Sequence, residues 1–559
     1  MDERGKTQRA GGAQERPAQR AGGGPERPAQ RAPDMPWAGW GTPAPLPERA
    51  RDLLAELLGA DLRATPAVPE DDVPLPPSRL SPAALAAFTA AAGADGVHTG
   101  RPARLLRAGG KSTTDLLRRR SGDAAGAPDA VLTPGSHDDV LAVLAAASEH
   151  RVAVIPFGGG TSVTGGVEPL PGRFAAAVAL DLRRLDGMTG LDTTSLTATL
   201  QAGLRGPEVE ELLARHGLTL GHLPQSFEHA TIGGFAATRS AGQASAGYGR
   251  FDDMVLAVTA ATPRGTIRAG GRAPASAAGP DLRQLLLGSE GVFGVITEVT
   301  VRVRPVPETV LDEAWSFGSL AEGLAALRVL SQASQTGRGG PVTVRLNDET
   351  ETAILGLTGG PQITGCLAIT SYEGTAAAAA AARAAAAEVL RGHGGAPLGA
   401  EPVAAWRDSR FAAPRTRDTL LGAGVLAETL ETATSWSNLP ALHGAVSAAL
   451  TGSLAAAGTP PVLSCHVSHV YPSGASLYYT VIAAQAADPA GQWAAAKAAA
   501  CDAITAHGGT ITHHHAVGTE HLPWMRDEIG GLGVNVLRAV KAVLDPVGVL
   551  NPGKLIPPR

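Results

Sequence analysis

The sequence is short of several residue types, and each shortage excludes a class of protein. Cysteine occurs only three times in 559 residues, as Cys366, Cys465 and Cys501. Cysteines that are few, odd in number and far apart do not build a disulfide framework, so we expect a reducing compartment, the cytoplasm. No window approaches eighteen consecutive strongly apolar residues, and the amino end lacks a signal-peptide pattern. A membrane-spanning helix is therefore not predicted, whereas peripheral contact with a membrane stays open.

An excess of charge of one sign is absent as well. The chain has 47 basic and 52 acidic residues and a formal net charge of −5. This balance predicts no nucleic acid and no anionic surface as a partner. At this length one hydrophobic core does not extend over the whole chain, so we expect at least two domains. A homodimer is compatible with the sequence but is not indicated by it.

Composition divides the chain into five parts. Residues 1–34 contain a near-duplication, "AQERPAQRAGG" followed by "GPERPAQRAPD", and have almost nothing apolar to bury, which predicts a disordered tail. Met35 follows directly, so Met1 and Met35 are both candidate starts. The other predicted parts are a helical region at 35–125, an α/β domain at 126–307, a substrate or cap domain at 308–520 and a C-terminal helical segment at 521–559 that packs back on the α/β domain.

Local patterns predict the elements before residue 307. Ser81 followed by Pro82 is a helix start, with apolar residues at three- and four-residue spacing behind it. From 129 to 156 the pattern is strand, helix capped near Ser136, and strand, which is an α/β unit. Further on, valines alternate with polar residues in "VFGVITEVTVRVRPVPE", which predicts a half-buried strand stopped by Pro305.

The region after residue 307 mixes strands and helices. The stretches "PVTVRLND", "GCLAITSYEG" and "SLYYTVIAA" predict strands. An alanine run behind Thr375 predicts a capped helix up to Arg391. The end of the chain reads as an amphipathic helix broken at "DP".

A glycine-rich loop ends the α/β unit. The stretch "IPFGGGTSVTGG", residues 155–166, is a strand end that runs into consecutive glycines and hydroxyl residues. Such a loop can turn successive N–H groups toward an anion, so a phosphate or pyrophosphate fits there. Neither standard nucleotide motif applies, since Val163 stands where the dinucleotide fingerprint needs glycine and no lysine follows. A tight turn without a ligand is the alternative for the loop alone.

Two further stretches have the same character. "LPQSFEHATIGGFAATRSAGQASAGYGRFDDMV", residues 223–255, and "GSEGVFGVIT", residues 288–297, are rich in glycine, alanine, serine and threonine. They contain few residues that fill a core. Backbone of this kind packs against a large flat ligand.

Three consecutive histidines stand in "THHHAVG", residues 512–518. On a strand His513 and His515 would share one face and His514 the other, and on a helix the three would fan out by about 100°. The three therefore cannot hold one ion together, and nothing nearby in the sequence supplies the further ligands that a pair would need for zinc. We expect no metal and favour acid–base work, with a polar loop as the alternative.

The glycine loop and the two stretches after it, in this order, resemble the vanillyl-alcohol-oxidase-like flavoproteins. The resemblance implies an α+β fold: a PCMH-type FAD-binding domain of two α/β subdomains, then an α+β substrate or cap domain with an antiparallel sheet. It also implies FAD bound without a covalent bond, because relatives with covalent flavin have a histidine or cysteine in the loop and this loop has neither. The implied cofactor contacts are Pro156, Gly158, Gly159, Gly160, Thr161, Ser162, Gln225, Ser226, Thr231, Gly233, Gly234, Thr238, Arg239, Ser240, Glu290, Gly291, Val295 and Ile296.

Within that superfamily the sequence resembles the alkyldihydroxyacetonephosphate synthase family more closely. The likeness runs from "PWAGWG" through "PFGGGTSV", "SFEHATIGGFAATRSAG" and "ETLETATSW" to "SCHVSHVYPSGASLYY" and "THHHAVG". It implies a redox-neutral ether-lipid reaction on a small lipid-like substrate: acyl-dihydroxyacetone phosphate exchanges its fatty acid for a fatty alcohol while flavin N5 holds the substrate covalently. The protein must then supply a proton-transfer group and cations for the phosphate.

The resemblance also assigns these tasks to residues. Proton transfer falls on the histidine triplet, with His514 as the base and Tyr478 as its acid/base partner. Arg417 is the implied clamp for the phosphate or another substrate anion, and Arg345 is a second organising cation. Taken singly, the tyrosine and the two arginines are each as well explained as ordinary strand or surface side chains.

Three residues depart from the family pattern and support an alternative. Gln225 stands where the family usually has aspartate, and His466 and His469 stand where we expect arginine and glutamine. The two extra imidazoles near Tyr478 allow for another substrate, so the alternative is an FAD-dependent dehydrogenase or oxidase of a 2-hydroxy acid or related alcohol. Its metal-dependent form is disfavoured, because "YPSGASLYY" stands where such relatives have a Gly-Asp-Gly-Asn stretch followed by histidine.

Overall fold

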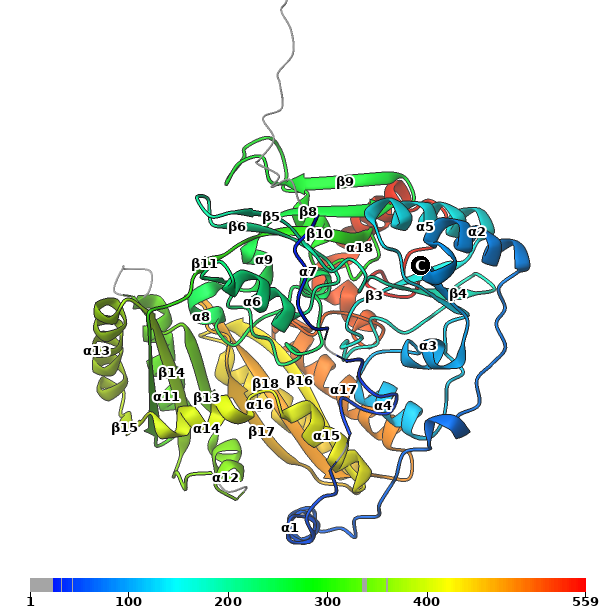
Figure 1. The fold of residues 1–559 in the computed structure, drawn as a ribbon. Coiled ribbons are helices and arrows are strands. Elements are labelled where there is room, and N and C mark those ends of the chain that lie inside the picture. Colours follow the sequence, from blue (N-terminus) through cyan, green and yellow to red (C-terminus); the bar gives the residue numbers. More distant parts are fainter. Residues whose placement is uncertain (1–23, 32, 43, 334–338, 358–359, 559) are drawn as a thin grey trace, which may run out of the picture.

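The computed structural model describes residues 24–31, 33–42, 44–333, 339–357 and 360–558. It has the α+β architecture that the sequence predicts, with a mixed four-stranded sheet and an antiparallel five-stranded sheet in one part and a large antiparallel sheet in the other (Figure 1). The helices are α1 (Glu48–Leu58), α2 (Pro82–Ala92), α3 (Arg101–Leu106), α4 (Thr113–Arg120), α5 (His137–His150), α6 (Gly206–Ala214), α7 (Ile232–Thr238), α8 (Ser245–Tyr248), α9 (Phe251–Met254), α10 (Arg283–Leu286), α11 (Leu320–Ala333), α12 (Glu349–Leu357), α13 (Ala376–Gly392), α14 (Glu401–Ser409), α15 (Ala413–Gly422), α16 (Leu439–Ala456), α17 (Pro489–Ala506) and α18 (Met525–Leu544).

The strands form a four-stranded sheet (order β1-β2-β4-β3), a five-stranded sheet (β5-β6-β10-β8-β9), a two-stranded sheet (β11-β7) and a seven-stranded sheet (β15-β12-β14-β13-β17-β18-β16). Their bounds are β1 (Val97–His98), β2 (Ala130–Leu132), β3 (Ala153–Phe157), β4 (Ala177–Asp181), β5 (Met188–Asp192), β6 (Thr197–Gln201), β7 (Leu218–Thr219), β8 (Val255–Thr262), β9 (Gly265–Gly270), β10 (Val295–Arg302), β11 (Arg304–Pro305), β12 (Thr309–Phe317), β13 (Thr343–Asn347), β14 (Cys366–Gly374), β15 (Ala396–Gly399), β16 (Val425–Ser435), β17 (Val462–Val467) and β18 (Gly474–Ala484).

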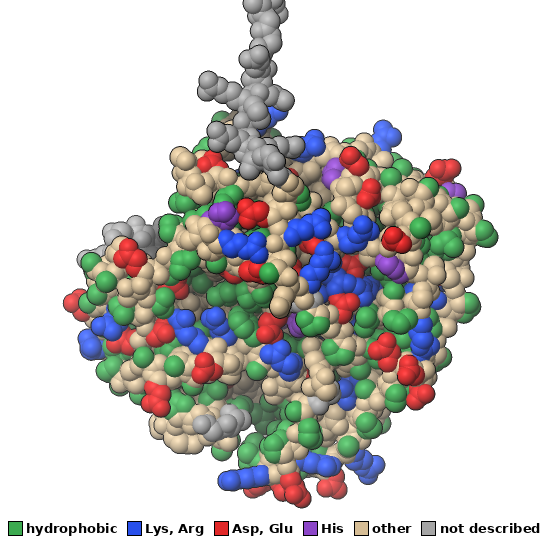
Figure 2. Space-filling model, viewed as in Figure 1, with side chains coloured by type: hydrophobic (Ala, Val, Ile, Leu, Met, Phe, Trp, Pro, Cys, Tyr) green, Lys and Arg blue, Asp and Glu red, His purple; other side chains and the backbone are tan. Residues whose placement is uncertain are grey.

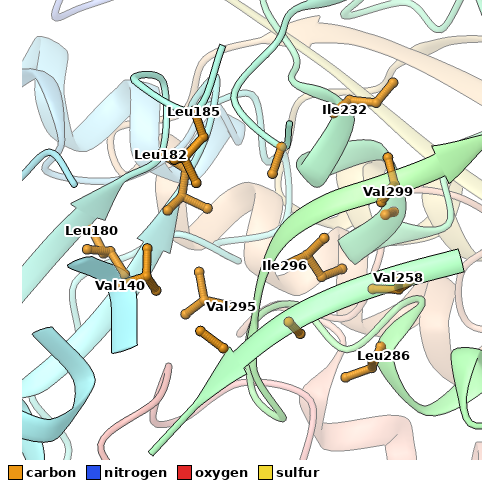
Figure 3. Close-up of a cluster of buried hydrophobic side chains, with 14 of the residues drawn as sticks. Val140, Leu180, Leu182, Leu185, Ile232, Val258, Leu286, Val295, Ile296 and Val299 are labelled. Carbon is orange, nitrogen blue, oxygen red and sulfur yellow. The ribbon is translucent and has the colours of Figure 1, made fainter. Parts of the chain in front are cut away.

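The four-stranded sheet positions the glycine loop. β2, β4 and β3 pair in parallel, as the predicted α/β unit requires. α5 begins directly after Ser136, whose side chain accepts a hydrogen bond from the N–H of Asp139. α2 packs on α5 and likewise begins at a serine, Ser81. Buried valines, leucines and isoleucines fill the space between this sheet and the five-stranded sheet (Figure 3). The loop that leaves β3 thus starts from a rigid edge.

β10 is the central strand of the five-stranded sheet and shows the predicted alternation. Val299 and Val301 are buried in the core, whereas Arg302 is exposed. The prediction that Pro305 stops the strand is slightly off: β10 ends at Arg302, and Pro305 pairs with Leu218 in the short strand β11. Alternation places Val295 in the core, whereas its neighbour Ile296 also lines a cavity.

The seven-stranded sheet has one face covered by four helices, and its other face packs against α14 at the β12–β14 end and lines a cavity elsewhere. α11, α13, α16 and α17 share a hydrophobic core with it. Alternation along the strands sends Leu346, Cys465 and Tyr479 into this core, and their neighbours Arg345, His466 and Tyr478 to the other face. The predicted helix behind Thr375 is α13, which the Thr375 hydroxyl caps.

One helix is more apolar than the sequence analysis expected when it predicted no membrane-spanning segment. By length and composition alone, α16 is apolar enough to cross a membrane. Its apolar side, which includes Leu442, Val446 and Leu450, is buried in the core of the seven-stranded sheet. This packing accounts for the apolar character without a bilayer.

The two ends of the chain pack against the sheets that surround the glycine loop. At the C-terminal end, the N–H of Val154 in β3 donates to the carbonyl of Val549, and the Lys541 ammonium donates to the carbonyl of Val292. At the other end, the predicted tail lies outside the described residues up to position 23, and the structure differs from the prediction at residues 24–31, 33 and 34. There the backbone of Glu26 pairs with Met188.

Charge holds this N-terminal segment in place. The carboxylate of Asp34 is bound by three arginine side chains, those of Arg107, Arg183 and Arg205. The segment has little apolar surface to bury, and ion pairs with residues far along the chain hold it instead.

Candidate active site

A cavity of about 600 Å³ lies where the two parts of the molecule meet. Its lining includes the glycine loop after β3, the stretch around α7, and the free face of the seven-stranded sheet. On the face shown in Figure 2 the surface is hollowed between the two parts, and hydrophobic side chains lie in the hollow. One cavity thus brings together the three glycine- and alanine-rich stretches and two histidines of the triplet, His514 and His515.

The glycine loop has the properties of an anion cradle. Among the described residues, the N–H groups of residues 158–163 donate to no acceptor. The loop has no room for larger side chains, because a Cβ on Gly159 would lie 2.0 Å from the carbonyl oxygen of His229. Successive free N–H groups at a strand end suit a pyrophosphate. The buried amide oxygen of Gln243, also in the lining and without a partner in the described chain, is a further place for a ligand hydrogen bond.

Most of the sequence-predicted cofactor contacts line this cavity. They are Pro156, Gly158, Gly159, Gly160, Thr161, Ser162, Gln225, Ser226, Thr231, Gly233, Gly234, Thr238, Ser240, Glu290, Gly291 and Ile296. Two predicted contacts do not. Arg239 turns away to pair with Asp252, and Val295 lies on the core side of β10. Val295 was predicted together with its neighbour Ile296, but alternation along β10 brings only Ile296 to the cavity, and Arg239 stands at the end of α7, where it turns outward.

The histidine triplet is held by a buried carboxylate that the sequence argument did not single out. Glu431 of β16 accepts four hydrogen bonds, from the N–H groups of His513 (2.6 Å), His514 (3.1 Å) and His515 (2.9 Å) and from the hydroxyl of Thr512 (2.6 Å). A carboxylate that binds three successive N–H groups fixes the backbone, so the three rings project in defined directions. The motif "ETLETATSW" contains this residue, but a glutamate in a strand does not indicate by itself which distant N–H groups it will bind.

A second buried carboxylate holds the residues behind the triplet. Glu290 was predicted as a cofactor contact, and its side chain accepts the N–H groups of Val517 (2.5 Å) and Gly518 (2.9 Å). Between the two anchors, Ala516 takes a positive φ of 69°, which alanine rarely adopts. Two anchors, one in the strand β16 and one in the turn before β10, therefore hold the chain on either side of this residue.

The triplet and the strand side chains form an aromatic wall. The ring centroid of Tyr478 lies 4.7 Å from that of His466, 6.0 Å from that of His514 and 5.5 Å from that of His515. All four residues line the cavity. His513 does not; its Nε2 contacts the hydroxyl of Tyr471 at 2.6 Å. The predicted proton-transfer group thus divides into two rings at the cavity and one behind them.

Burial sets the protonation of this wall. It lowers the pKa of His513 and His514 to about 3 and that of His515 to about 4, and the neighbouring Glu431 carboxylate opposes this only in part. Burial also raises the pKa of Tyr478 to about 12. At neutral pH the imidazoles are uncharged and carry a free lone pair, and the phenol keeps its proton. A ring with a low pKa passes on readily any proton that it accepts.

Both predicted cations face the cavity, and each is paired with a carboxylate. Arg417 of α15 is 3.0 Å from Glu428 and donates to the carbonyl of Lys111, while its buried Nε has no partner among the described residues. Arg345 contacts Glu351 and lies 3.0 Å from Nδ1 of His466. A substrate anion would find one unused donor on Arg417.

The structure corrects one premise about the histidines. Residues 512–515 are neither strand nor helix, and the Nδ1 atoms of His513 and His514 lie 3.0 Å apart. The ring of His469 comes within 5.0 Å of both, centroid to centroid. Three imidazoles therefore converge, although neither regular geometry nor nearby sequence predicted it.

Comparison with known proteins places these features in a family. Residues 128–271 match the model of an FAD binding domain, and residues 307–555 match the C-terminal domain of FAD linked oxidases. The fold and cavity are therefore those of an FAD-linked flavoenzyme, as the sequence predicted, and FAD is the cofactor.

Similarity over most of the chain gives the particular family. The chain is 33% identical over 480 residues to alkyldihydroxyacetonephosphate synthase of Trypanosoma brucei brucei, covering 81% of this chain and 77% of the relative. It is 32% identical over 524 residues to the synthase of Dictyostelium discoideum, covering 89% and 84%. A solved alkyldihydroxyacetonephosphate synthase matches with a TM-score of 0.79 and 28% identity, over 93% of this chain and 99% of that one. The chain belongs to the alkyldihydroxyacetonephosphate synthase family.

The buried histidines predict a stability that falls in mild acid. Their folded pKa values lie well below 6.5, so as the pH falls through 6.5 the unfolded chain takes up protons that the folded chain does not. At pH 5.5 each such histidine lowers the free energy of unfolding by about 1.4 kcal/mol relative to neutral pH. The histidines concerned, whose pKa burial lowers to about 3 or 4, are His222, His229, His513, His514, His515 and His521.

Urea unfolding of the holoprotein at pH 7.5 and pH 5.5 tests this. Burial raises the pKa of the Glu290 carboxyl to about 7, which works in the opposite direction, but the histidines outnumber it. We expect a clearly lower urea midpoint at pH 5.5. A midpoint that stays constant or rises would contradict the burial of these rings as neutral groups.

Proposed function

We propose that this protein exchanges the acyl group of an acyl-dihydroxyacetone phosphate for a fatty alcohol. The observation that carries the proposal is the single cavity, in which an anion cradle, a wall of neutral imidazoles with a phenol, and an unused arginine donor face one another. The bond from the dihydroxyacetone carbon to the ester oxygen breaks, and a bond from that carbon to the alcohol oxygen forms. The alcohol's proton ends on the released fatty acid, so no electrons leave the site.

The chain offers groups that suit FAD. The free N–H groups of residues 158–163 would hold its pyrophosphate, and the backbone around Gly233 and Gly234 leaves room for a flat ring system. When bound, FAD supplies the reactive ring against which the dihydroxyacetone phosphate unit is positioned. Since the loop contains neither histidine nor cysteine, we propose that FAD is held without a covalent bond.

His514 is the residue best placed to move the proton. It lines the cavity, its backbone is fixed by Glu431, and its ring is neutral. A neutral imidazole can take a proton from carbon or from the entering alcohol, and its low pKa lets it hand that proton to the leaving carboxylate. The ring of Tyr478 stacks on that of His514 at a centroid distance of 6.0 Å. Tyr478 keeps its proton and can donate a hydrogen bond to an oxygen of the leaving carboxylate.

The rest of the lining suits a lipid-like substrate. Arg417, with its unused Nε, is the clamp that we propose for the phosphate or carboxylate. The apolar side chains of Trp406 in α14, Leu420 in α15 and Ile482 in β18 also line the cavity. This apolar lining would accommodate acyl and alkyl chains.

The test compares two reactions on purified holoprotein. One incubation contains an acyl-dihydroxyacetone phosphate and a long-chain alcohol, and ether product and released fatty acid are measured. The other contains 2-hydroxy acids with a reducible dye. We expect ether and fatty acid in equal amounts without dye reduction. Bleaching of the dye by a hydroxy acid, with no ether formed, would overturn the proposal in favour of the FAD-dependent oxidoreductase.

The cytoplasmic location, the peripheral membrane contact and the homodimer stay predictions. One feature supports the membrane contact: Leu532, Val536 and Val543 on one side of α18 are 79%, 52% and 69% exposed. Apolar side chains that share a helix face in contact with water are typical of a surface that meets lipid or protein.

A further inference from the structure

We propose that His469, His513 and His514 form a binding site for one divalent cation such as Zn²⁺ at the wall of the cavity. One ring nitrogen from each lies within 4.8 Å of the others. The Nδ1 atoms of His513 and His514 are 3.0 Å apart, and two nitrogens on a tetrahedral zinc ion lie about 3.3 Å apart, given Zn–N bonds of about 2.0–2.1 Å. Small ring movements would therefore bring three nitrogens to one ion.

The hydrogen bonds around the three rings leave suitable nitrogens free. Nδ1 of His469 contacts the Ser245 hydroxyl at 2.7 Å, which leaves its Nε2 for an ion. Nε2 of His513 contacts the Tyr471 hydroxyl at 2.6 Å, and its Nδ1 contacts only the Nδ1 of His514, a contact that an ion between the two rings would replace. A metal-binding histidine is usually oriented by a hydrogen bond on its other nitrogen. Neither Ser245 nor Tyr471 belongs to the cavity lining, so this second layer is separate from the cofactor contacts.

The surroundings suit a cation with an open position. The Glu431 carboxylate, fully buried, lies 3.7 Å from Nδ1 of His514, and its charge offsets part of the charge of the ion. His469 and His514 line the cavity and His513 lies behind them. Three protein nitrogens leave a fourth tetrahedral position, which then points into the cavity.

Metal binding and proton transfer would compete for the same ring. An ion on Nδ1 of His514 fixes the proton on Nε2, so the imidazole can no longer accept one. We therefore expect Zn²⁺ to inhibit the acyl-for-alkyl exchange. This consequence rests on the proposed function, whereas binding of the ion does not.

Binding is tested on the holoprotein after treatment with a chelator. Equilibrium dialysis against Zn²⁺, followed by metal analysis, gives the stoichiometry and affinity, and the visible absorption of added Co²⁺ reports the geometry. The variant His469→Gln removes one ligand, and His216→Gln makes the same change at an exposed histidine of the other part. We expect one Zn²⁺ per chain for the wild type and His216→Gln, and at least 10-fold weaker binding for His469→Gln.

Equal Zn²⁺ affinity of the wild type and His469→Gln would overturn the metal site, as would Co²⁺ spectra without tetrahedral character. The exchange assay separates this failure from that of the proposed function. If ether forms but no ion binds at His469, the metal site is wrong and the exchange reaction stands. If one ion binds tightly and exchange continues at full rate, the metal site stands and the proton-transfer role of His514 is wrong.

Discussion

Replacing His514 with glutamine is expected to lower kcat for the exchange reaction by about 10²–10⁴-fold, the range that a general acid–base contributes, while the protein stays yellow. Glutamine keeps the backbone N–H that binds Glu431 and fills much of the same space, so the loop should keep its shape. The ring of His514 stands in the aromatic wall beside Tyr478 and is not one of the groups of the glycine loop that would hold the pyrophosphate, so FAD content should not change. Turnover and flavin absorbance are measured with a chelator present.

The matched control is His507→Gln, at an exposed histidine at the end of α17 that does not line the cavity. It should leave both turnover and flavin content unchanged. Turnover of His514→Gln within a factor of a few of the wild type would show that another group moves the proton. Loss of flavin from that variant would instead give His514 a role in holding the cofactor.

The change Gly159→Ala is expected to weaken FAD binding by about 10–100-fold. The added Cβ would lie 2.0 Å from the His229 carbonyl oxygen, so the glycine loop or the stretch before α7 must move. Overpacking of this kind costs about 1–3 kcal/mol, and here the displaced N–H groups are those that would hold the pyrophosphate. FAD content after purification and the Kd from flavin fluorescence measure the effect.

Gly444→Ala in α16 is the matched control, because a Cβ there meets nothing within 4 Å. It should keep the wild-type Kd for FAD and unfold at the same or a slightly higher temperature. A Gly159→Ala protein with the FAD affinity of the control would show that the loop does not carry the pyrophosphate.

Short-range patterns were enough to predict much of the fold and of the cavity lining. Ser81, Ser136 and Thr375 start helices as their side chains predict, because a cap acts within three residues. The order of the glycine-rich stretches was enough to find the cofactor cavity. The alternation of buried and exposed side chains in β10 was predicted correctly. Val295 and Ile296 were nevertheless both predicted as cofactor contacts, and only Ile296 lines the cavity.

Long-range partners account for what the sequence could not show. Glu431 binds a loop that follows it by some eighty residues, and Glu290 binds the same loop from the other part of the molecule. No local pattern predicts which N–H groups a buried carboxylate will accept. Residues 512–515 are neither helix nor strand, and the rings of His513 and His514 both contact that of His469. The prediction of no metal assumed a strand or a helix and therefore did not include this cluster. Asp34 likewise finds its arginines only in the folded chain.

The visible absorption spectrum of the purified wild-type chain, before and after denaturation, tests the central claim most directly. The account predicts flavin absorption equivalent to one FAD per chain, released as free FAD when the protein is unfolded, because the cradle holds it without a covalent bond. A colourless chain that takes up no added FAD would contradict the account, and flavin that stays with the unfolded polypeptide would contradict the non-covalent cradle.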